Sequence, residues 1–168
     1  MKNFSISLIV LTFALAVSGC GKKRVETLPP APGEALTNSD PAQSRIAPGS
    51  QADFVQKIAG QDIIFFDTDR FDIDAIDAEA LRSQANWLSQ YPNKRVRIEG
   101  HADERGTREY NLALGERRAN AAKNYLQSLG IVASRLSIVS YGKERPVALG
   151  SNESAWSQNR RAVTVTID

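Results

Sequence analysis

The residues most able to do chemistry lie between Gly100 and Ala121, GHADERGTREYNLALGERRANA, a segment dense in charge that holds the only histidine of the chain. Stepping about 100° per residue along a helix places Arg118 on the same face as Leu114 and Ala122. A guanidinium on an apolar, buried face is costly unless an anionic group compensates it. The pattern therefore predicts that Arg118 meets a negative charge.

The carboxylate best placed to meet Arg118 is Asp103, which follows a predicted strand and precedes Gly106 in a turn. Two interpretations fit the charges alone. In the first, Asp103 and Arg118 form an internal salt bridge, since many such pairs are structural. In the second, each contacts a ligand group of opposite charge. A zwitterionic ligand suits the second interpretation, because an arginine binds a carboxylate through two parallel hydrogen bonds.

His101, Asp103 and Glu104 raise the question of catalysis. A catalytic zinc usually takes three protein ligands that include more than one His or Cys, and this chain has one of each. A serine nucleophile elbow would need G-x-S-x-G, which does not occur. We therefore expect no enzyme, metal site or cofactor. The balance of 21 Lys and Arg against 19 Asp and Glu, without a basic block, also disfavours nucleic acid as a partner.

Hydrophobic periodicity predicts the elements that position this segment. Strands are expected at Ile63–Phe66, Lys94–Gly100, Arg135–Tyr141 and Arg161–Ile167. Helices are expected at Asp74–Gln90, before Pro92, and at Arg108–Leu129, between the N-cap Thr107 and Gly130. This order of strands and helices predicts an α+β sandwich of two layers, with both helices on one face of a mixed four-stranded sheet.

The N-terminus has the pattern of an export signal, with Lys2, an apolar run from Ile6 to Val17 and small residues before Cys20. Because the run is short for a membrane span, residues 1–19 are predicted to be a signal peptide; an anchor helix with an incidental cysteine is the alternative. AVSGC resembles a bacterial lipobox, which implies that Cys20 is lipidated. Residues 20–52 are rich in Pro, Ala, Gly and Ser, and are predicted to be a disordered tether of a domain at 53–168.

Four motifs, FFDTDRFDI, IEGHADERGTREYNLALGERRANA, SYGKERP and NRRAVTV, resemble the OmpA-like domain of the peptidoglycan-associated lipoproteins. The resemblance covers roughly residues 53–168. It implies a domain that is not catalytic and that binds the meso-diaminopimelate side chain of peptidoglycan. Carried over residue by residue, it assigns ligand binding to Asp103, Arg118, Asp69, Arg105, Leu114 and Thr68.

Several motif residues have structural interpretations that the sequence leaves open. They are a turn closed by Thr68, a helix cap at Asp69, a solvated charge at Arg105 and a core position at Leu114. The neighbouring motif residues are interpreted as structural: Asn111 in the loop, and Asn159, Arg160 and Arg161 at the start of the last strand.

The resemblance also implies a place in the cell and a set of partners. It implies an outer-membrane lipoprotein whose domain faces the periplasm and which acts with TolB and other Tol proteins in envelope integrity and cell division. Gly21 after the cysteine, in place of an aspartate, agrees with sorting to the outer membrane. A periplasmic adaptor that binds proteins without touching the wall is the alternative function.

Overall fold

A four-stranded mixed sheet organises residues 46–167, the part of the chain that the computed structural model describes. The elements in chain order are α1 (Gln51–Lys57), β1 (Ile63–Phe65), α2 (Ala75–Gln90), β2 (Arg95–His101), α3 (Arg108–Ser128), the 3-10 turn η1 (Ala133–Arg135), β3 (Leu136–Gly142), α4 (Glu153–Asn159) and β4 (Arg161–Ile167). The predicted signal peptide, Cys20 and most of the predicted tether lie outside the described residues.

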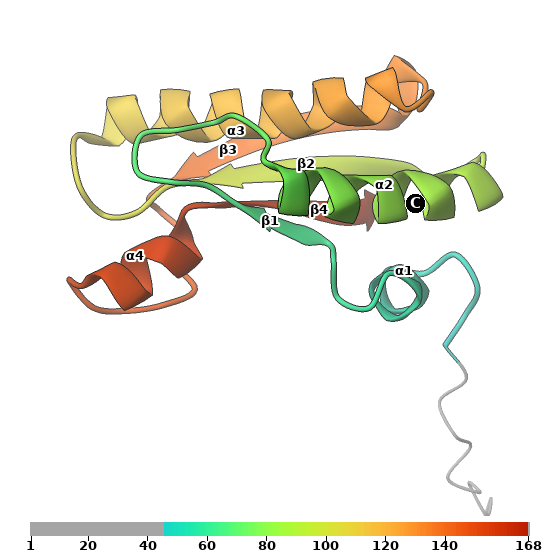
Figure 1. The fold of residues 1–168 in the computed structure, drawn as a ribbon, viewed down its shortest axis with the longest axis horizontal. Coiled ribbons are helices and arrows are strands. Elements are labelled where there is room, and N and C mark those ends of the chain that lie inside the picture. The colour runs from blue at the N-terminus through green and yellow to red at the C-terminus, as the bar shows by residue number, and fades with distance from the viewer. Residues whose placement is uncertain (1–45, 168) are drawn as a thin grey trace, which may run out of the picture. The chain divides into compact units, whose positions relative to one another are not determined.

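The strand order of the sheet is β1-β4-β2-β3. Strand β4 runs antiparallel to both β1 and β2, whereas β2 and β3 are parallel. Helix α3 connects the parallel pair, and α2 connects β1 to β2, so that the long helices lie on one face of the sheet (Figure 1). This arrangement confirms the predicted α+β fold.

The face of the sheet toward the helices holds both apolar and polar side chains. Val96 and Ile98 of β2 are fully buried there. Ile98 pairs with Thr164 of β4, which is also buried and donates its hydroxyl to Gln84 Oε1 at 2.7 Å. The hydroxyl of Thr164 is thus satisfied although it is buried. The valines of β4 alternate with its threonines and are half-buried on the other face of the sheet.

The end of β2 and the first half of α3 approach each other through two glycines. A Cβ atom added to Gly100 would lie 1.8 Å from the carbonyl oxygen of Gly115, and one added to Gly115 would lie 2.4 Å from Ser140 Oγ. No side chain fits between the two backbones at this point. The pair therefore fixes α3 against the strand end that carries the predicted site.

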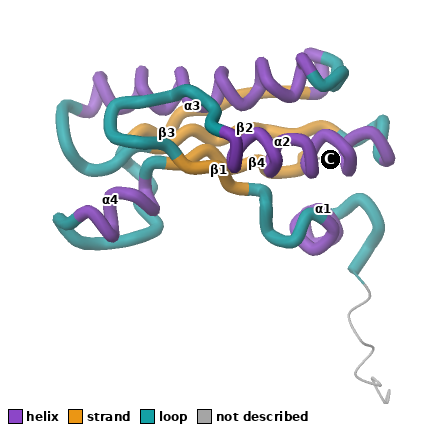
Figure 2. The backbone as a smooth tube through the Cα atoms, in the orientation of Figure 1, coloured by secondary structure: helices purple, strands orange, loops and turns teal. Residues whose placement is uncertain are grey.

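Two short helices, α1 and α4, were not predicted from the sequence (Figure 2). Helix α1 begins at Gln51, within the predicted tether, so ordered structure starts before the predicted boundary at residue 53. Ser50 caps this helix, and Phe54 packs fully buried against Trp87, with ring centroids 4.9 Å apart. Each helix has only seven residues, which is too short for a helical period to show in the sequence.

The long helices match their predicted ranges to within a residue, and one apolar residue at an end of each lies outside the core. Ile76 in the first turn of α2 is 81% exposed, and Leu129, the C-cap of α3, is also exposed. The core is formed instead by residues that include Leu81, Leu88, Val96, Ile98, Ala122 and Leu126.

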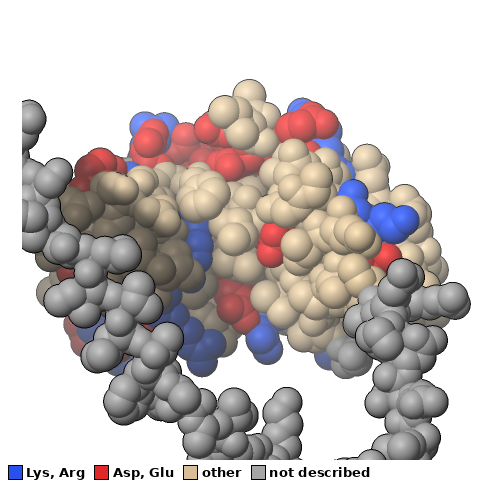
Figure 3. Space-filling model, turned by 90° about the horizontal axis from the view of Figure 1, so that it is seen from below, with Lys and Arg blue, Asp and Glu red and all other residues tan. Residues whose placement is uncertain are grey.

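Charges are mixed on the molecular face drawn in Figure 3, where Lys and Arg side chains lie among Asp and Glu. Among residues 46–167, no helix combines the length and the apolar character needed to cross a membrane.

Candidate ligand-binding site

A cavity of about 230 Å³ lies where the end of β2 and the start of α3 meet the loop between β1 and α2. We call it the Asp103–Arg118 pocket. Its lining residues are Thr68, Asp69, Ala102, Asp103, Arg105, Gly106, Tyr110, Asn111, Leu114 and Arg118. The fold thus brings together all six ligand-binding residues predicted from the sequence.

Arg118 is fully buried and is held by backbone carbonyl groups of two segments. Its Nε donates to Arg70 O at 2.9 Å, and its Nη2 donates to Asp67 O at 3.0 Å, both in the loop after β1. Its Nη1 donates to His101 O, at the end of β2, at 2.8 Å. Since a guanidinium carries five N–H groups, these bonds leave one donor on each terminal nitrogen.

The internal salt bridge between Asp103 and Arg118, the first of the two interpretations of the charges, does not form, because the hydrogen bonds of Arg118 go to carbonyl oxygens and those of Asp103 to other groups. Burial lowers the pKa of Arg118 to about 10, and the charge of Arg160 acts in the same direction. The side chain is still a cation at neutral pH. Among residues 46–167, no carboxylate is in direct contact with this buried charge, although the charges of Asp103 and Asp69 act on it from further away.

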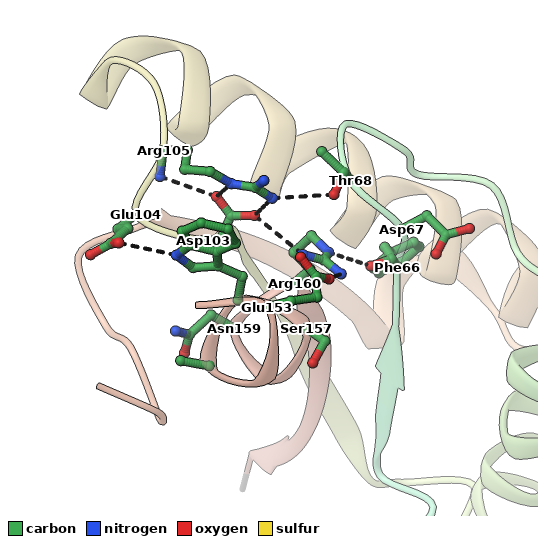
Figure 4. A network of polar contacts seen from close by, with 12 residues as sticks. Phe66, Asp67, Thr68, Asp103, Glu104, Arg105, Glu153, Ser157, Asn159 and Arg160 are labelled. Atoms are coloured by element: carbon green, nitrogen blue, oxygen red, sulfur yellow. Dashed lines mark hydrogen bonds and ion pairs between the residues drawn. The ribbon is translucent and has the colours of Figure 1, made fainter. Parts of the chain in front are cut away.

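Asp103 is nearly buried and is surrounded by donors (Figure 4). Its Oδ1 accepts from the backbone N and from Nε of Arg105, each at 3.1 Å, and its Oδ2 accepts from Nη2 of Arg105 at 2.6 Å. Arg160 Nη1 lies 3.5 Å from Oδ2. Burial would raise the pKa of Asp103, but the hydrogen bonds and the charge of Arg105 outweigh it and hold the pKa below its ordinary value.

Arg105 is not the free surface charge that one interpretation of the sequence allowed. Beyond its contacts with Asp103, its Nη2 donates to Thr68 Oγ1 at 3.2 Å, and its guanidinium lies 4.1 Å from the ring centre of Trp156. Trp156 in turn donates Nε1 to Glu104 at 3.0 Å. Thr68, assigned either a turn or a ligand from the sequence, thus contacts Arg105 across the pocket.

Asp69 does not cap α2, because Asp74 does so with its side chain accepting from Asp77 N at 2.8 Å. Asp69 instead has a left-handed backbone, with φ of 61°, and accepts a hydrogen bond from the hydroxyl of Tyr110. Aspartate tolerates this conformation better than most residues do. Asp69 and Tyr110 therefore close one wall of the pocket, while Leu114, buried as expected, forms an apolar wall.

Asn111 is confirmed as a loop-bonding residue, since its Nδ2 donates to Arg105 O at 2.7 Å and to Thr107 O at 3.0 Å. Arg160 makes structural contacts, as expected, and one of them brings it beside Asp103. Its Nε donates to Phe66 O at 2.9 Å and its Nη2 contacts Glu153 at 2.5 Å, but its Nη1 faces Asp103 and makes no hydrogen bond. Tyr110 and Arg160 are the site residues that sequence reasoning missed.

His101 has an unusual environment for a polar side chain. It is 2% exposed, neither ring nitrogen has a hydrogen-bond partner, and its ring centre lies 5.5 Å from that of Tyr141. Burial lowers the pKa of His101 to about 4, and the charges of Arg161 and Arg145 act in the same direction. Within residues 46–167, no group of His, Cys, Asp and Glu side chains is arranged to hold a metal ion.

A larger cavity of about 430 Å³ lies beside the Asp103–Arg118 pocket. Its lining residues are Phe65, Phe66, Asp67, Arg70, Asp72, Asp74, Ile76, Asp77, Ser157, Gln158 and Arg160. This cavity is larger, but charged side chains that line it are already paired with one another, as in the contact of Arg70 with Asp72 at 2.8 Å. We therefore place the candidate site in the smaller pocket, where a buried cation lacks a carboxylate contact.

Comparison with known proteins assigns the class of this domain. A sequence model of the OmpA family matches residues 65–160, which contain both long helices, the strands β2 and β3, and every residue that lines the pocket. The chain therefore belongs to the OmpA family. A protein of Agrobacterium fabrum (strain C58) named peptidoglycan-associated lipoprotein is 52% identical over 160 residues, which cover 95% of this chain and 86% of that protein.

Solved structures agree with this assignment. The crystal structure of the peptidoglycan-associated lipoprotein from Burkholderia pseudomallei matches with a TM-score of 0.64 and 39% identity, over 68% of this chain and 100% of that chain. The C-terminal domain of Helicobacter pylori MotB matches with a TM-score of 0.59 but 19% identity, over 64% of this chain and 84% of that chain, which is a likeness of fold alone. The matches of higher identity place the chain among the peptidoglycan-associated lipoproteins, whose name does not denote an enzyme.

Proposed function

We propose that the Asp103–Arg118 pocket binds the meso-diaminopimelate side chain of peptidoglycan and so attaches this protein to the cell wall. The observation that carries the proposal is Arg118, a fully buried cation that contacts no carboxylate of the described residues and has an N–H group to spare on each terminal nitrogen. Those two donors match the two oxygens of a carboxylate, which arginine binds in parallel. The ligand carboxylate would then compensate the buried charge.

Asp103 supplies the second half of the proposed recognition. Its side chain lines the same pocket, and its ionised carboxylate accepts hydrogen bonds from a cationic side chain. The diaminopimelate centre carries an ammonium and a carboxylate on one carbon, so one group can meet Asp103 while the other meets Arg118. A ligand with only one of the two charges would leave one side of the pocket uncompensated.

The test is binding of the wild-type chain to two kinds of purified wall. Lysine-type peptidoglycan keeps the ammonium but lacks the second carboxylate, so it leaves Arg118 unpaired. We expect diaminopimelate-type wall to bind at least about 30-fold more tightly, because an unpaired charge at a desolvated contact costs roughly 2 to 5 kcal/mol. Sedimentation of the protein with each wall measures the difference, and equal binding to both would contradict the proposed recognition.

A second measurement uses Asp103→Asn, which removes the charge but keeps the shape. The matched control is Asp72→Asn, because Asp72 is an exposed acid near the pocket whose ion pair is with Arg70 and not with Arg118 or Arg105. Asp103→Asn should abolish sedimentation with the wall, and Asp72→Asn should not change it. A chain that binds partner proteins but never the wall would act instead as the adaptor considered from the sequence.

The lipid anchor and the Tol partners complete the proposal. The family name supports a lipoprotein, and we infer that Cys20, outside the described residues, is its lipidated N-terminus at the outer membrane, with the domain in the periplasm. Mass spectrometry of membrane-extracted protein should then show loss of residues 1–19 and a gain of acyl mass.

Association with TolB, and through it a role in cell division, is tested by co-purification from cross-linked cells.

A further inference from the structure

Asp103 has little acceptor capacity left for a ligand. Both of its carboxylate oxygens already accept hydrogen bonds from the Arg105 side chain, at 3.1 Å from Nε and 2.6 Å from Nη2. Arg105 therefore holds Asp103 as a two-point ion pair of the kind that an external cation would need to make. A ligand ammonium and the Arg105 guanidinium cannot both take this position.

The contacts that hold Arg105 are of a kind that can be released. Its side chain is 39% exposed, and its other partners are the Thr68 hydroxyl and the face of the Trp156 ring. Arg160, the second cation on Asp103, is in contrast 6% exposed and is tied to Phe66 O and Glu153. Moving Arg105 breaks only side-chain contacts, whereas moving Arg160 would disturb the start of β4.

We propose that Arg105 is an internal competitor of the ligand: in the free domain its guanidinium occupies the position on Asp103 that the ligand ammonium takes in the complex. The inference rests on the function proposed above. Binding then requires Arg105 to leave Asp103, and the free energy of that step lowers the apparent affinity of the pocket. Thr68 and Trp156 act as positioning residues, because they hold Arg105 in the competing position.

The structure also offers acidic groups that can receive Arg105 when it leaves. The charges of Glu153 and Glu104 both act on Arg105 and raise its pKa, after the larger effect of its hydrogen bond to Asp103. Glu104 is fixed beside Trp156 by the indole N–H, and Glu153 lies in the first turn of α4. When the guanidinium leaves Asp103, the charges of these two carboxylates still favour its cationic form.

The experiment measures binding of a soluble muropeptide that ends in meso-diaminopimelate by the full-length chain purified in mild detergent. Arg105→Ala should bind it about tenfold more tightly than wild type, since both an exposed ion pair and a cation–π contact no longer oppose binding. Thr68→Val, which removes one contact that holds Arg105, should bind about twofold to threefold more tightly. The matched control is Arg108→Ala, another exposed arginine near the pocket, which pairs with Glu144 instead; it should leave the affinity unchanged.

Tryptophan fluorescence gives an independent measure of the displacement. Arg105 lies against Trp156, so muropeptide binding to wild type should change the emission, and the change should vanish in Arg105→Ala and in Trp156→Phe. Weaker binding by Arg105→Ala would overturn the inference alone and would make Arg105 a ligand contact. Absence of binding by both wild type and Arg105→Ala would overturn the proposed function, and the inference with it.

Discussion

The two charged sides of the Asp103–Arg118 pocket differ in the groups that hold the charged side chain in place. On the first side, Arg118 is fully buried and bonded to three backbone carbonyls, which belong to Asp67, Arg70 and His101. On the second side, Asp103 is held mainly by the side chains of Arg105 and Arg160. The backbone fixes the cation, whereas side chains hold the anion, and one of them, Arg105, is partly exposed and can be released.

The difference assigns different roles to the two sides. Backbone carbonyls move only if the loop after β1 or the end of β2 moves, so the donors of Arg118 are in place before a ligand arrives. Such preorganisation avoids part of the cost of ordering a site on binding. The side chain of Arg105 can rotate without any change in the fold, so the anionic side can be masked or exposed. We therefore expect changes at Arg118 to alter folding, and changes at Asp103 and Arg105 to alter binding.

The largest expected effect is on stability when Arg118 is replaced. Arg118→Leu leaves the buried carbonyl oxygen of His101 and the part-buried ones of Asp67 and Arg70 without their donor, and an unsatisfied buried group costs about 1 to 3 kcal/mol. The free energy of unfolding should fall by about 3 kcal/mol. Asp103→Asn should lower it by only about 1 kcal/mol, because the neighbouring Arg160 keeps its contacts with Glu153 and Phe66 O.

Urea denaturation of both variants and of wild type measures this contrast. A loss of binding by Arg118→Leu would not show that Arg118 contacts the ligand, since an unstable chain also fails to bind. The comparison of the two wall types with the wild-type chain tests that contact instead. Equal losses of stability for the two variants would break the distinction between the sides.

The next effect is a dependence of stability on pH that belongs to the Arg118 side. Burial lowers the pKa of His101 from its ordinary value of 6.5 to about 4, while its carbonyl anchors Arg118. Between pH 6.5 and 4 the unfolded chain binds a proton that the folded chain does not, so stability falls as the pH falls through this window. The difference in pKa corresponds to about 3 kcal/mol. The pKa of Asp103 is below its ordinary value, so its side stays ionised there.

The control for this prediction is His101→Phe, which keeps an aromatic ring but does not titrate. Burial raises the pKa of Asp77 to about 6, and this works in the opposite sense, because the folded chain holds that proton as the pH falls from 6 to 3.8. The contribution of Asp77 cancels when wild type is compared with His101→Phe. If the two proteins lost stability in parallel between pH 6.5 and 4, the assignment to His101 would be wrong.

The sequence predicted which two charged residues meet at the pocket better than it predicted the groups that hold them. The helical period placed Arg118 on the buried face of α3, and the turn after β2 placed Asp103 near it, because both depend on local patterns. The partners of Arg118 could not be predicted in this way, since Asp67 and Arg70 lie some 50 residues earlier and contribute carbonyl groups, which every residue has. The masking of Asp103 by Arg105 depends on a rotamer and on Trp156, which belongs to a helix too short to predict.

The smallest expected effect is on stability when Arg105 is replaced, and its dependence on salt sharpens the comparison. Arg105→Ala removes an ion pair whose arginine is 39% exposed, and exposed pairs contribute about 1 kcal/mol or less. The variant keeps the backbone N–H that bonds Asp103 Oδ1, and Asp103 keeps its contact with Arg160.

Because salt screens exposed charges, the small loss in 0.05 M salt should largely disappear in 0.5 M salt, where the Debye length is roughly 4 Å. The loss caused by Arg118→Leu should change little between the two concentrations, because the Arg118 side chain is itself fully buried and salt screens buried groups much less. Urea denaturation at the two salt concentrations measures both, and a loss of several kcal/mol for Arg105→Ala would mean that the anionic side is as much a part of the folded core as Arg118 is.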